Sequence, residues 1–189
     1  LHDDQRQNRM LPPLVRDLIV SGVDCDQLPG GSGQFGRDVT NPIPVNGPVG
    51  EAVYLSRLMT GRGMPIMFHR IGSVGSVDAF ETVSACGRDW DLLYMSMYHP
   101  RRSTRPPAGY RIGDAGQTGS LLHGTTSWLP DFPNQMNEAV KAFTKRAIGL
   151  PLPSLMVQRA LQDVTFRRPA GHRALLEAAG RHFTFASAE

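Results

Sequence analysis

The sequence predicts an α+β fold, in which an antiparallel β-meander over about residues 65–99 packs against flanking helices. Three observations support this prediction. Strand-like runs follow one another with short turns between them, helical patterns precede and follow these runs, and long loops rich in Gly and Pro connect the parts. A length of 189 residues, with 40% apolar and 20% charged residues, is typical of a single globular domain, which we expect to cover residues 1–189.

The N-terminal third is predicted to hold two helices. Residues 1–9 are polar and should form a flexible tail. A short helix should begin near Pro13, because an apolar stripe follows it and ends at Gly22. After a loop rich in Gly and Pro, a second helix should run over about 48–60, since Pro48 suits a first helical position and apolar residues recur behind it at helical spacing.

The middle of the chain is predicted to form the meander, from three strand-like runs: Pro65–Ile71, Val77–Ser84 and Trp90–His99. Because a short turn cannot join parallel strands, the last two runs should be antiparallel neighbours. Residues 100–133 return to loop. The last third should form three helices separated by prolines, over about 136–149, 154–164 and 170–181.

The two halves of the chain differ in charge. Residues 1–100 carry 8 Arg and 11 acidic residues, whereas residues 101–189 carry 12 basic and 6 acidic ones, and 18 of the 20 basic residues are Arg. Arg favours carboxylate and phosphate partners, although GC-rich codon usage alone also enriches it. No apolar run is long enough for a membrane span, so a soluble protein without membrane contact is expected. Two cysteines, Cys25 and Cys86, are too few for a disulfide framework and favour a cytoplasmic location.

Two loop motifs are interpreted as structural. Gly31–Gly36 matches G-x-G-x-x-G, but Pro29 precedes it where a dinucleotide site has a strand, so we expect this loop to bind no nucleotide. In the proline-rich stretch Asn41–Glu51, the carboxylate of Glu51 should lie in the first turn of a helix and complement its dipole. The chain has no H-E-x-x-H and no paired Cys-x-x-Cys, so neither a metal site nor a cofactor is expected.

Three ionisable residues interrupt the apolar face of the predicted sheet. The odd-numbered strand positions are apolar except for His69, Glu81 and His99. An ionisable group on a core face has to be paired or neutral. If Ile71 lies opposite Val77, Glu81 lies diagonal to His69, and their side chains should be within hydrogen-bonding or one-water distance. Such a pair can perform acid–base chemistry or form a buried structural hydrogen bond.

A basic segment interleaved with aromatic residues and prolines follows the last predicted strand. Its candidate anion-binding residues are Arg101, Arg102, Arg105 and Arg111. Such segments are typical of surfaces that bind nucleic acid or acidic protein, and equally of loops whose arginines pair with the protein's own acids. The other histidines have no partner at ligand spacing, so surface or capping roles are expected for His123, His172 and His182.

Two main function classes follow from these residues. The first is a non-catalytic binding or accessory protein whose Arg-rich loop contacts an anionic protein surface or nucleic acid. The alternative is a small hydrolase-type enzyme that uses His69, Glu81 and His99, with or without a divalent metal. The non-catalytic class is favoured. An enzyme needs these three residues in an accessible cleft, whereas a binding module needs the four arginines exposed and unpaired. A third class, a structural subunit, would show an exposed apolar patch on the C-terminal helices.

Overall fold

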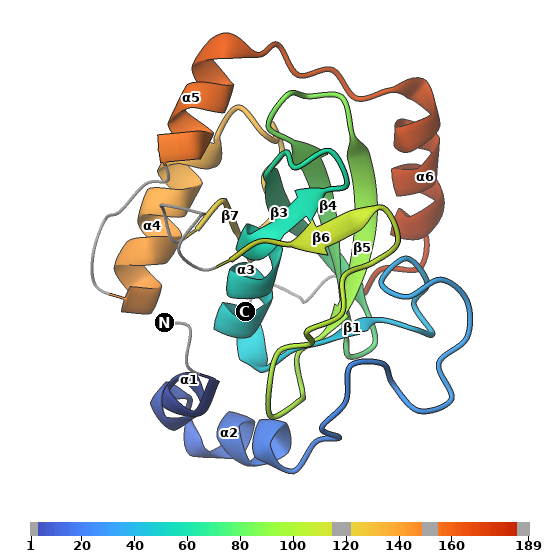
Figure 1. Cartoon of the computed structure of the whole chain (residues 1–189), viewed down its shortest axis with the longest axis vertical. Coiled ribbons are helices and arrows are strands. Elements are labelled where there is room, and N and C mark those ends of the chain that lie inside the picture. Colours follow the sequence, from blue (N-terminus) through green and yellow to red (C-terminus); the bar gives the residue numbers. More distant parts are fainter. Residues whose placement is uncertain (1–3, 115–121, 149–154, 185–189) are drawn as a thin grey trace.

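The computed structural model describes residues 4–114, 122–148 and 155–184. These residues form six helices, a mixed five-stranded sheet and a two-stranded sheet, which confirms the predicted α+β class (Figure 1). The strands of the larger sheet are, in spatial order, β1 (Ile43–Pro44), β5 (Trp90–Ser96), β4 (Val77–Ser84), β3 (Ile66–Val74) and β7 (Gly124–Thr125).

The predicted meander is present as β3, β4 and β5, which pair antiparallel in sequence order. β4 is the central strand and is buried along almost its whole length. A β-bulge in β3 sets the register, so that Val74 lies opposite Val77 and His69 lies directly opposite Glu81. The predicted pairing of Ile71 with Val77 is therefore wrong, because it assumed a longer turn and a ladder without a bulge.

The two outer strands, β1 and β7, are two residues long and pair parallel with β5 and β3. Neither was evident from the sequence, because a two-residue strand has no alternation and parallel pairing depends on contacts between distant segments. Pro44 is compatible with β1 because an edge strand leaves one row of backbone groups outside the ladder.

Helix α3 (Gly47–Arg57) follows β1 directly, and Pro48 lies in its first turn as predicted. Gly47 has a φ of +78°, a conformation that L side chains rarely adopt, and this residue turns the chain from β1 into the helix. The predicted extension to residue 60 is wrong, since Leu58–Thr60 form strand β2. Pairing of β2 with β6 (Tyr110–Ile112) overrides the local helical spacing.

The N-terminal residues form two helices, α1 (Asp4–Met10) and α2 (Pro13–Val20). The expectation of a flexible tail over residues 1–9 is corrected for residues 4–9, because Gln7 and Asn8 of α1 are buried. Asn8 Nδ2 donates to the carbonyl oxygen of Pro100 at 2.9 Å, and Asn46 Nδ2 donates to Asn8 Oδ1 at 3.2 Å. These partners are distant in sequence, so the polar composition alone did not reveal the helix.

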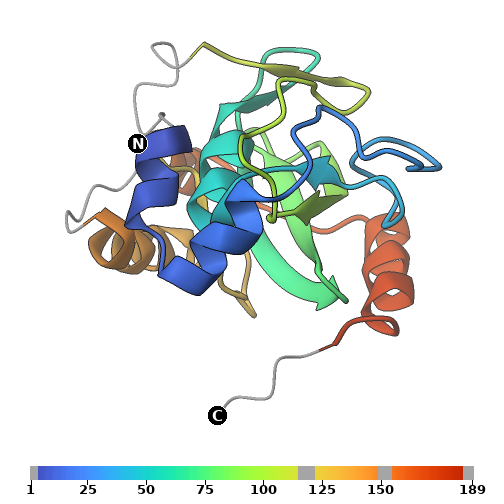
Figure 2. The same cartoon turned by 90° about the horizontal axis from the view of Figure 1, so that it is seen from below.

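The three C-terminal helices are α4 (Met136–Ile148), α5 (Leu155–Asp163) and α6 (Ala170–Gly180), close to their predicted bounds. The expected end at Gly149 and cap at Ser154 lie outside the described residues. α4 packs against β7 and α5, whereas α6 packs against β5, so α4 and α6 lie at opposite edges of the sheet (Figures 1 and 2). Within the described ranges, no helix combines the length and apolar character needed to cross a membrane.

Candidate functional site

The predicted contact between His69 and Glu81 is confirmed, and it forms the centre of a buried polar cluster. His69 Nε2 lies 2.7 Å from Glu81 Oε2, and each residue is 1% exposed. A buried carboxylate and imidazole are tolerated only when their polar atoms find partners. The remaining members of the cluster are those partners.

His69 makes a hydrogen bond through each ring nitrogen. The backbone N–H of Leu129 donates to Nδ1 at 3.0 Å, so Nδ1 carries no proton and Nε2 is the donor to Glu81. The ring of Phe132 stacks on the imidazole, with 4.2 Å between ring centroids. Burial lowers the pKa of His69 and outweighs the raising effect of Glu81. His69 is therefore a neutral imidazole with no nitrogen left for a substrate.

Arg168 and His172, from the C-terminal third, complete the cluster. Arg168 holds the carboxylate of Glu81 in two places, with Nε 2.6 Å from Oε1 and Nη2 3.0 Å from Oε2. His172, in the first turn of α6, places Nε2 at 3.2 Å from Oε1. The expected surface or capping role of His172 is wrong, because its side chain is buried and paired. The sequence carries no signal for this contact, which joins residues 91 positions apart.

The charge of Glu81 is fixed by these partners. Burial alone would raise the pKa of Glu81, but hydrogen bonds from His172, His69 and Arg168 outweigh burial and hold the pKa well below its ordinary range. The carboxylate therefore stays ionised and accepts from both imidazoles and from the guanidinium. Arg168 also lies over the ring of Trp90, at 5.6 Å from the ring centroid, so the cluster is packed on an aromatic wall.

His99, the third predicted catalytic residue, lies apart from this cluster. Glu81 pairs with the middle of β5, whereas His99 lies beyond the end of that strand. Its Nδ1 is 2.8 Å from the carbonyl oxygen of Val23, and its Nε2 is 3.0 Å from Ser96 Oγ. These contacts tie the end of the sheet to the segment after α2. The expected grouping of His69, Glu81 and His99 in one site is not formed.

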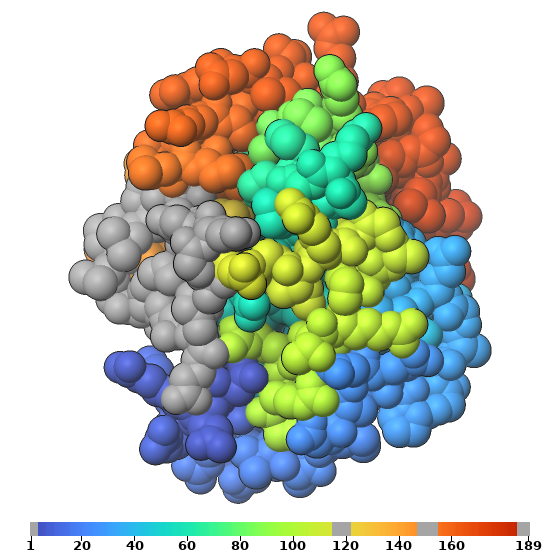
Figure 3. Space-filling view, in the orientation of Figure 1, coloured from blue at the N-terminus to red at the C-terminus, as the bar shows by residue number. Residues whose placement is uncertain are grey.

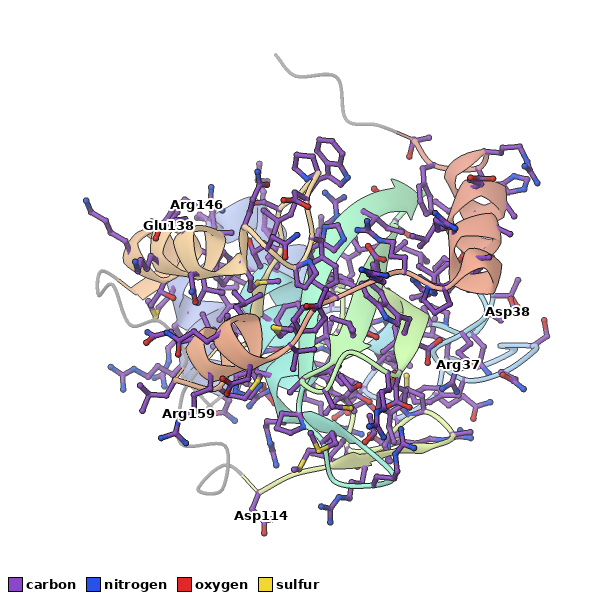
Figure 4. The ribbon with its side chains drawn as sticks, turned by 90° about the horizontal axis from the view of Figure 1, so that it is seen from above. Arg37, Asp38, Asp114, Glu138, Arg146 and Arg159 are labelled. Atoms are coloured by element: carbon purple, nitrogen blue, oxygen red, sulfur yellow. The ribbon has the colours of Figure 1, made fainter. Side chains whose placement is uncertain are left out.

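An open cleft of about 770 Å³ lies beside the cluster. It is at the edge of the sheet, where β1 pairs only with the end of β5 and leaves the start of β5 uncovered. His172 lines the cleft from α6 and Trp90 lines it from the start of β5, whereas Arg37 and Tyr110 line it from the loop before β1 and from β6. Figure 3 shows α6, the β6 region and this loop bordering one another, and Figure 4 labels Arg37 near α6.

The lining of the cleft is cationic. Arg37 Nη2 pairs with Asp91 Oδ2 at 2.7 Å, and Arg62 Nη2 pairs with Asp89 Oδ1 at 2.5 Å. Arg88 also lines the cleft, is exposed, and has no hydrogen bond or ion pair with the described part of the chain. The first turn of α6 borders the same space, and the free N–H groups of a helix start add positive potential. The three arginines and two aspartates of this lining therefore carry one net positive charge.

In the Arg-rich segment, Arg101 and Arg102 form ion pairs with acidic residues of the same chain. Arg101 pairs with Asp24 and, at 2.7 Å, with Asp26, whereas Arg102 Nε lies 2.6 Å from Asp4 Oδ1. The hydrogen bond from Arg101 is the main reason that the pKa of Asp26 is lowered to about 2. These arginines join the end of the meander to α1 and to the segment after α2.

The other two candidates of this segment differ from each other. Arg105 bonds to the side-chain oxygen of Gln27, and its guanidinium lies over the ring of Phe35, at 4.6 Å from the ring centroid. Arg111 is exposed and has no hydrogen bond or ion pair with the residues that the structure describes. Arg111 is therefore the one candidate of the four that meets the requirement for a docking residue.

Glu51 occupies a second buried acidic position, on the face of the sheet that α3 covers. The helix begins four residues before it, so the expected place in the first helical turn is wrong. Glu51 is 1% exposed, and its side chain bonds to Asp78 of β4, which Arg70 Nη2 also contacts at 2.8 Å. Burial raises the pKa of Glu51 well above its ordinary range, and the charge of Asp78 raises it further. Glu51 is a neutral acid that donates its proton to Asp78.

Glu51→Gln is expected to increase the free energy of unfolding at neutral pH. The folded wild type keeps a proton on Glu51 that the unfolded chain loses above about pH 4.3, so wild-type stability falls as pH rises, by up to about 1.4 kcal/mol per pH unit. Gln retains a donor for Asp78 and does not ionise. Urea denaturation between pH 4.5 and 8 measures both slopes, with the exposed Glu138→Gln as control. A wild-type slope that Glu51→Gln leaves unchanged would contradict the buried neutral acid.

Gly31–Gly36 lies in a loop between α2 and β1, with neither a strand directly before it nor a helix directly after it. That context matches the interpretation of the motif as structural. Over residues 4–114, 122–148 and 155–184, no group of three or more His, Cys, Asp or Glu side chains is placed to hold a metal ion.

Comparisons with known proteins add no relative. No protein-family model matches the chain, and neither curated proteins nor solved structures give a significant match.

Proposed function

We propose that the protein binds a small anionic ligand in the cleft between α6 and the loop before β1. The observation that carries this proposal is Arg88, which is exposed at the cleft and unpaired among the described residues. Arg37 and Arg62 line the same cleft, and only two aspartates offset these three arginines. Arg side chains present paired N–H donors to carboxylate and phosphate groups, so ligands of that chemistry suit the lining.

The size and the walls of the cleft also support a small ligand. A volume of about 770 Å³ lies within the usual range for small-molecule sites. Trp90 and Tyr110 supply aromatic surface, and their polar atoms are already used. Trp90 Nε1 donates to the carbonyl oxygen of Gly87 at 3.0 Å, and Tyr110 Oη donates to Asp91 at 3.1 Å. The aromatic walls are therefore held in place before a ligand enters.

Contact between the Arg-rich segment and an anionic protein surface or nucleic acid stays a prediction with less support. Binding through this segment would have to break the contacts of Arg101, Arg102 and Arg105 within the chain, whereas Arg111 is available without such a loss. The cleft offers an unpaired arginine, a helix start and aromatic walls together.

Arg88→Gln is expected to weaken binding of inorganic phosphate by about tenfold, because a charge-assisted hydrogen bond to an anion contributes about 1.5 kcal/mol or more. Titration calorimetry at low ionic strength measures the affinity, and added NaCl should weaken the wild-type interaction. The matched control is Arg111→Gln, which removes another exposed arginine outside the cleft and should leave the affinity unchanged. If Arg111→Gln has the larger effect, the anion binds at the Arg-rich segment and the cleft proposal is wrong.

A further inference from the structure

The hydrogen bonds of the Glu81 cluster determine which nitrogen of His172 is free. Glu81 is an ionised carboxylate and can only accept, so His172 Nε2 carries the proton that bonds to Oε1. In a neutral imidazole the other nitrogen, Nδ1, then holds a lone pair. Nδ1 of His172 has no hydrogen-bond partner in the described ranges, and His172 lines the cationic cleft.

Glu81 therefore orients and polarises the ring of His172 through Nε2, while Nδ1 is left to bind another molecule. A carboxylate that holds one imidazole nitrogen fixes the ring position and stabilises the imidazolium that forms when the other nitrogen takes a proton. His69 does not share this property, because Leu129 occupies its Nδ1. Of the two imidazoles on Glu81, only His172 can exchange a proton with a ligand in the cleft.

We propose that His172 is the general base of a phosphodiester hydrolase reaction in the cleft, with Glu81 as its positioning residue. This inference rests on the proposed anion-binding function of the same cleft. The single unbalanced positive charge of Arg37, Arg62 and Arg88 with their two aspartates matches the single negative charge of a phosphodiester. In this proposal His172 provides the base, and the arginines balance the charge of the phosphodiester.

The reaction balances with water as the only co-reactant. His172 Nδ1 removes a proton from a water molecule as the water oxygen forms a bond to phosphorus. The bond from phosphorus to the leaving oxygen breaks, and the leaving oxygen takes the electron pair. The imidazolium then gives its proton to that oxygen or to solvent. Glu81 stays ionised throughout, and the arginines hold the non-bridging oxygens.

The test compares the release of p-nitrophenolate from bis(p-nitrophenyl) phosphate by the wild type, His172→Gln and His182→Gln. His172→Gln should reduce the rate by about 100-fold or more, the usual contribution of a general base. His182→Gln removes an exposed histidine outside the cleft and should keep the wild-type rate. Calorimetry with inorganic phosphate on the same variants shows whether His172→Gln still binds the anion.

The possible outcomes separate this inference from the proposed function. Loss of turnover with phosphate binding retained in His172→Gln supports the general base. Phosphate binding that depends on Arg88, without His172-dependent turnover, overturns the hydrolase and leaves the binding function. Failure of the wild type to bind phosphate overturns both. Nitrogen-15 NMR of the histidine rings tests the premise directly, since a proton on Nδ1 of His172 in place of Nε2 would overturn the proposed role whatever the kinetics show.

Discussion

Glu81→Gln is expected to lower the free energy of unfolding by about 2–4 kcal/mol at neutral pH. The substitution removes the charge that Arg168 pairs with and replaces one acceptor oxygen by an amide N–H₂, which then faces the donors of Arg168 and of either His172 or His69. Breaking a buried ion pair by removing one partner costs about 3–5 kcal/mol. A loss at or below the lower end of that range is expected here because Arg168 is 28% exposed and solvent can hydrate it. Urea denaturation followed by circular dichroism measures the change.

The pH dependence of this loss has a definite sign. Because the pKa of Glu81 is depressed in the folded state, its stabilisation is present above the ordinary Glu pKa of about 4.3 and decreases as pH falls below it. The difference between wild type and Glu81→Gln should therefore shrink in acid. Glu177→Gln, an exposed site on α6, is the control and should change stability by no more than about 0.5 kcal/mol. A Glu81→Gln variant as stable as this control would contradict the cluster as described.

The meander could be predicted because local signals agree along its strands. Val77–Ser84 and Trp90–Ser96 have β-branched and aromatic residues between short turns, and antiparallel pairing follows from the turn length. The C-terminal helices could be predicted equally well, since prolines separate runs with helical spacing. By contrast, β2 and β6 exist only through pairing between segments about fifty residues apart along the chain. No local pattern in Leu58–Thr60 distinguishes the end of a helix from such a strand.

Two of the four residues in the buried polar cluster could be predicted from the sequence. His69 and Glu81 stand out because they break an apolar face, and the β-bulge in β3 sets the register that places both side chains on the same side of the sheet. Strand parity could not identify Arg168 and His172, because they contact Glu81 from the segment that returns to the sheet after α5. His99 shares the parity of the pair but lies too far along β5 to join it. Parity identifies a face and leaves the position along the strand open.

The triple variant Arg101→Gln, Arg102→Gln and Arg105→Gln is expected to lower the free energy of unfolding by about 2–4 kcal/mol. Arg102 accounts for most of this loss, because its side chain is 9% exposed and its removal leaves Asp4 without its cation. Arg101 and Arg105 are more exposed, and exposed ion pairs contribute up to about 1 kcal/mol each. Urea denaturation of the triple variant and of Arg102→Gln alone separates these contributions.

The result also decides between the two roles of the Arg-rich segment. If the three arginines served only to dock a partner, their removal would change stability by no more than about 0.5 kcal/mol per site. The matched control replaces Arg159, Arg173 and Arg181 with Gln. These arginines are exposed and make no hydrogen bond or ion pair with the described residues, and Arg159 points away from the body of the protein (Figure 4). Both triple variants lose the same charge, so a larger loss at Arg101, Arg102 and Arg105 reports their specific contacts. Equal stability of the two variants would instead support a docking surface formed by this segment.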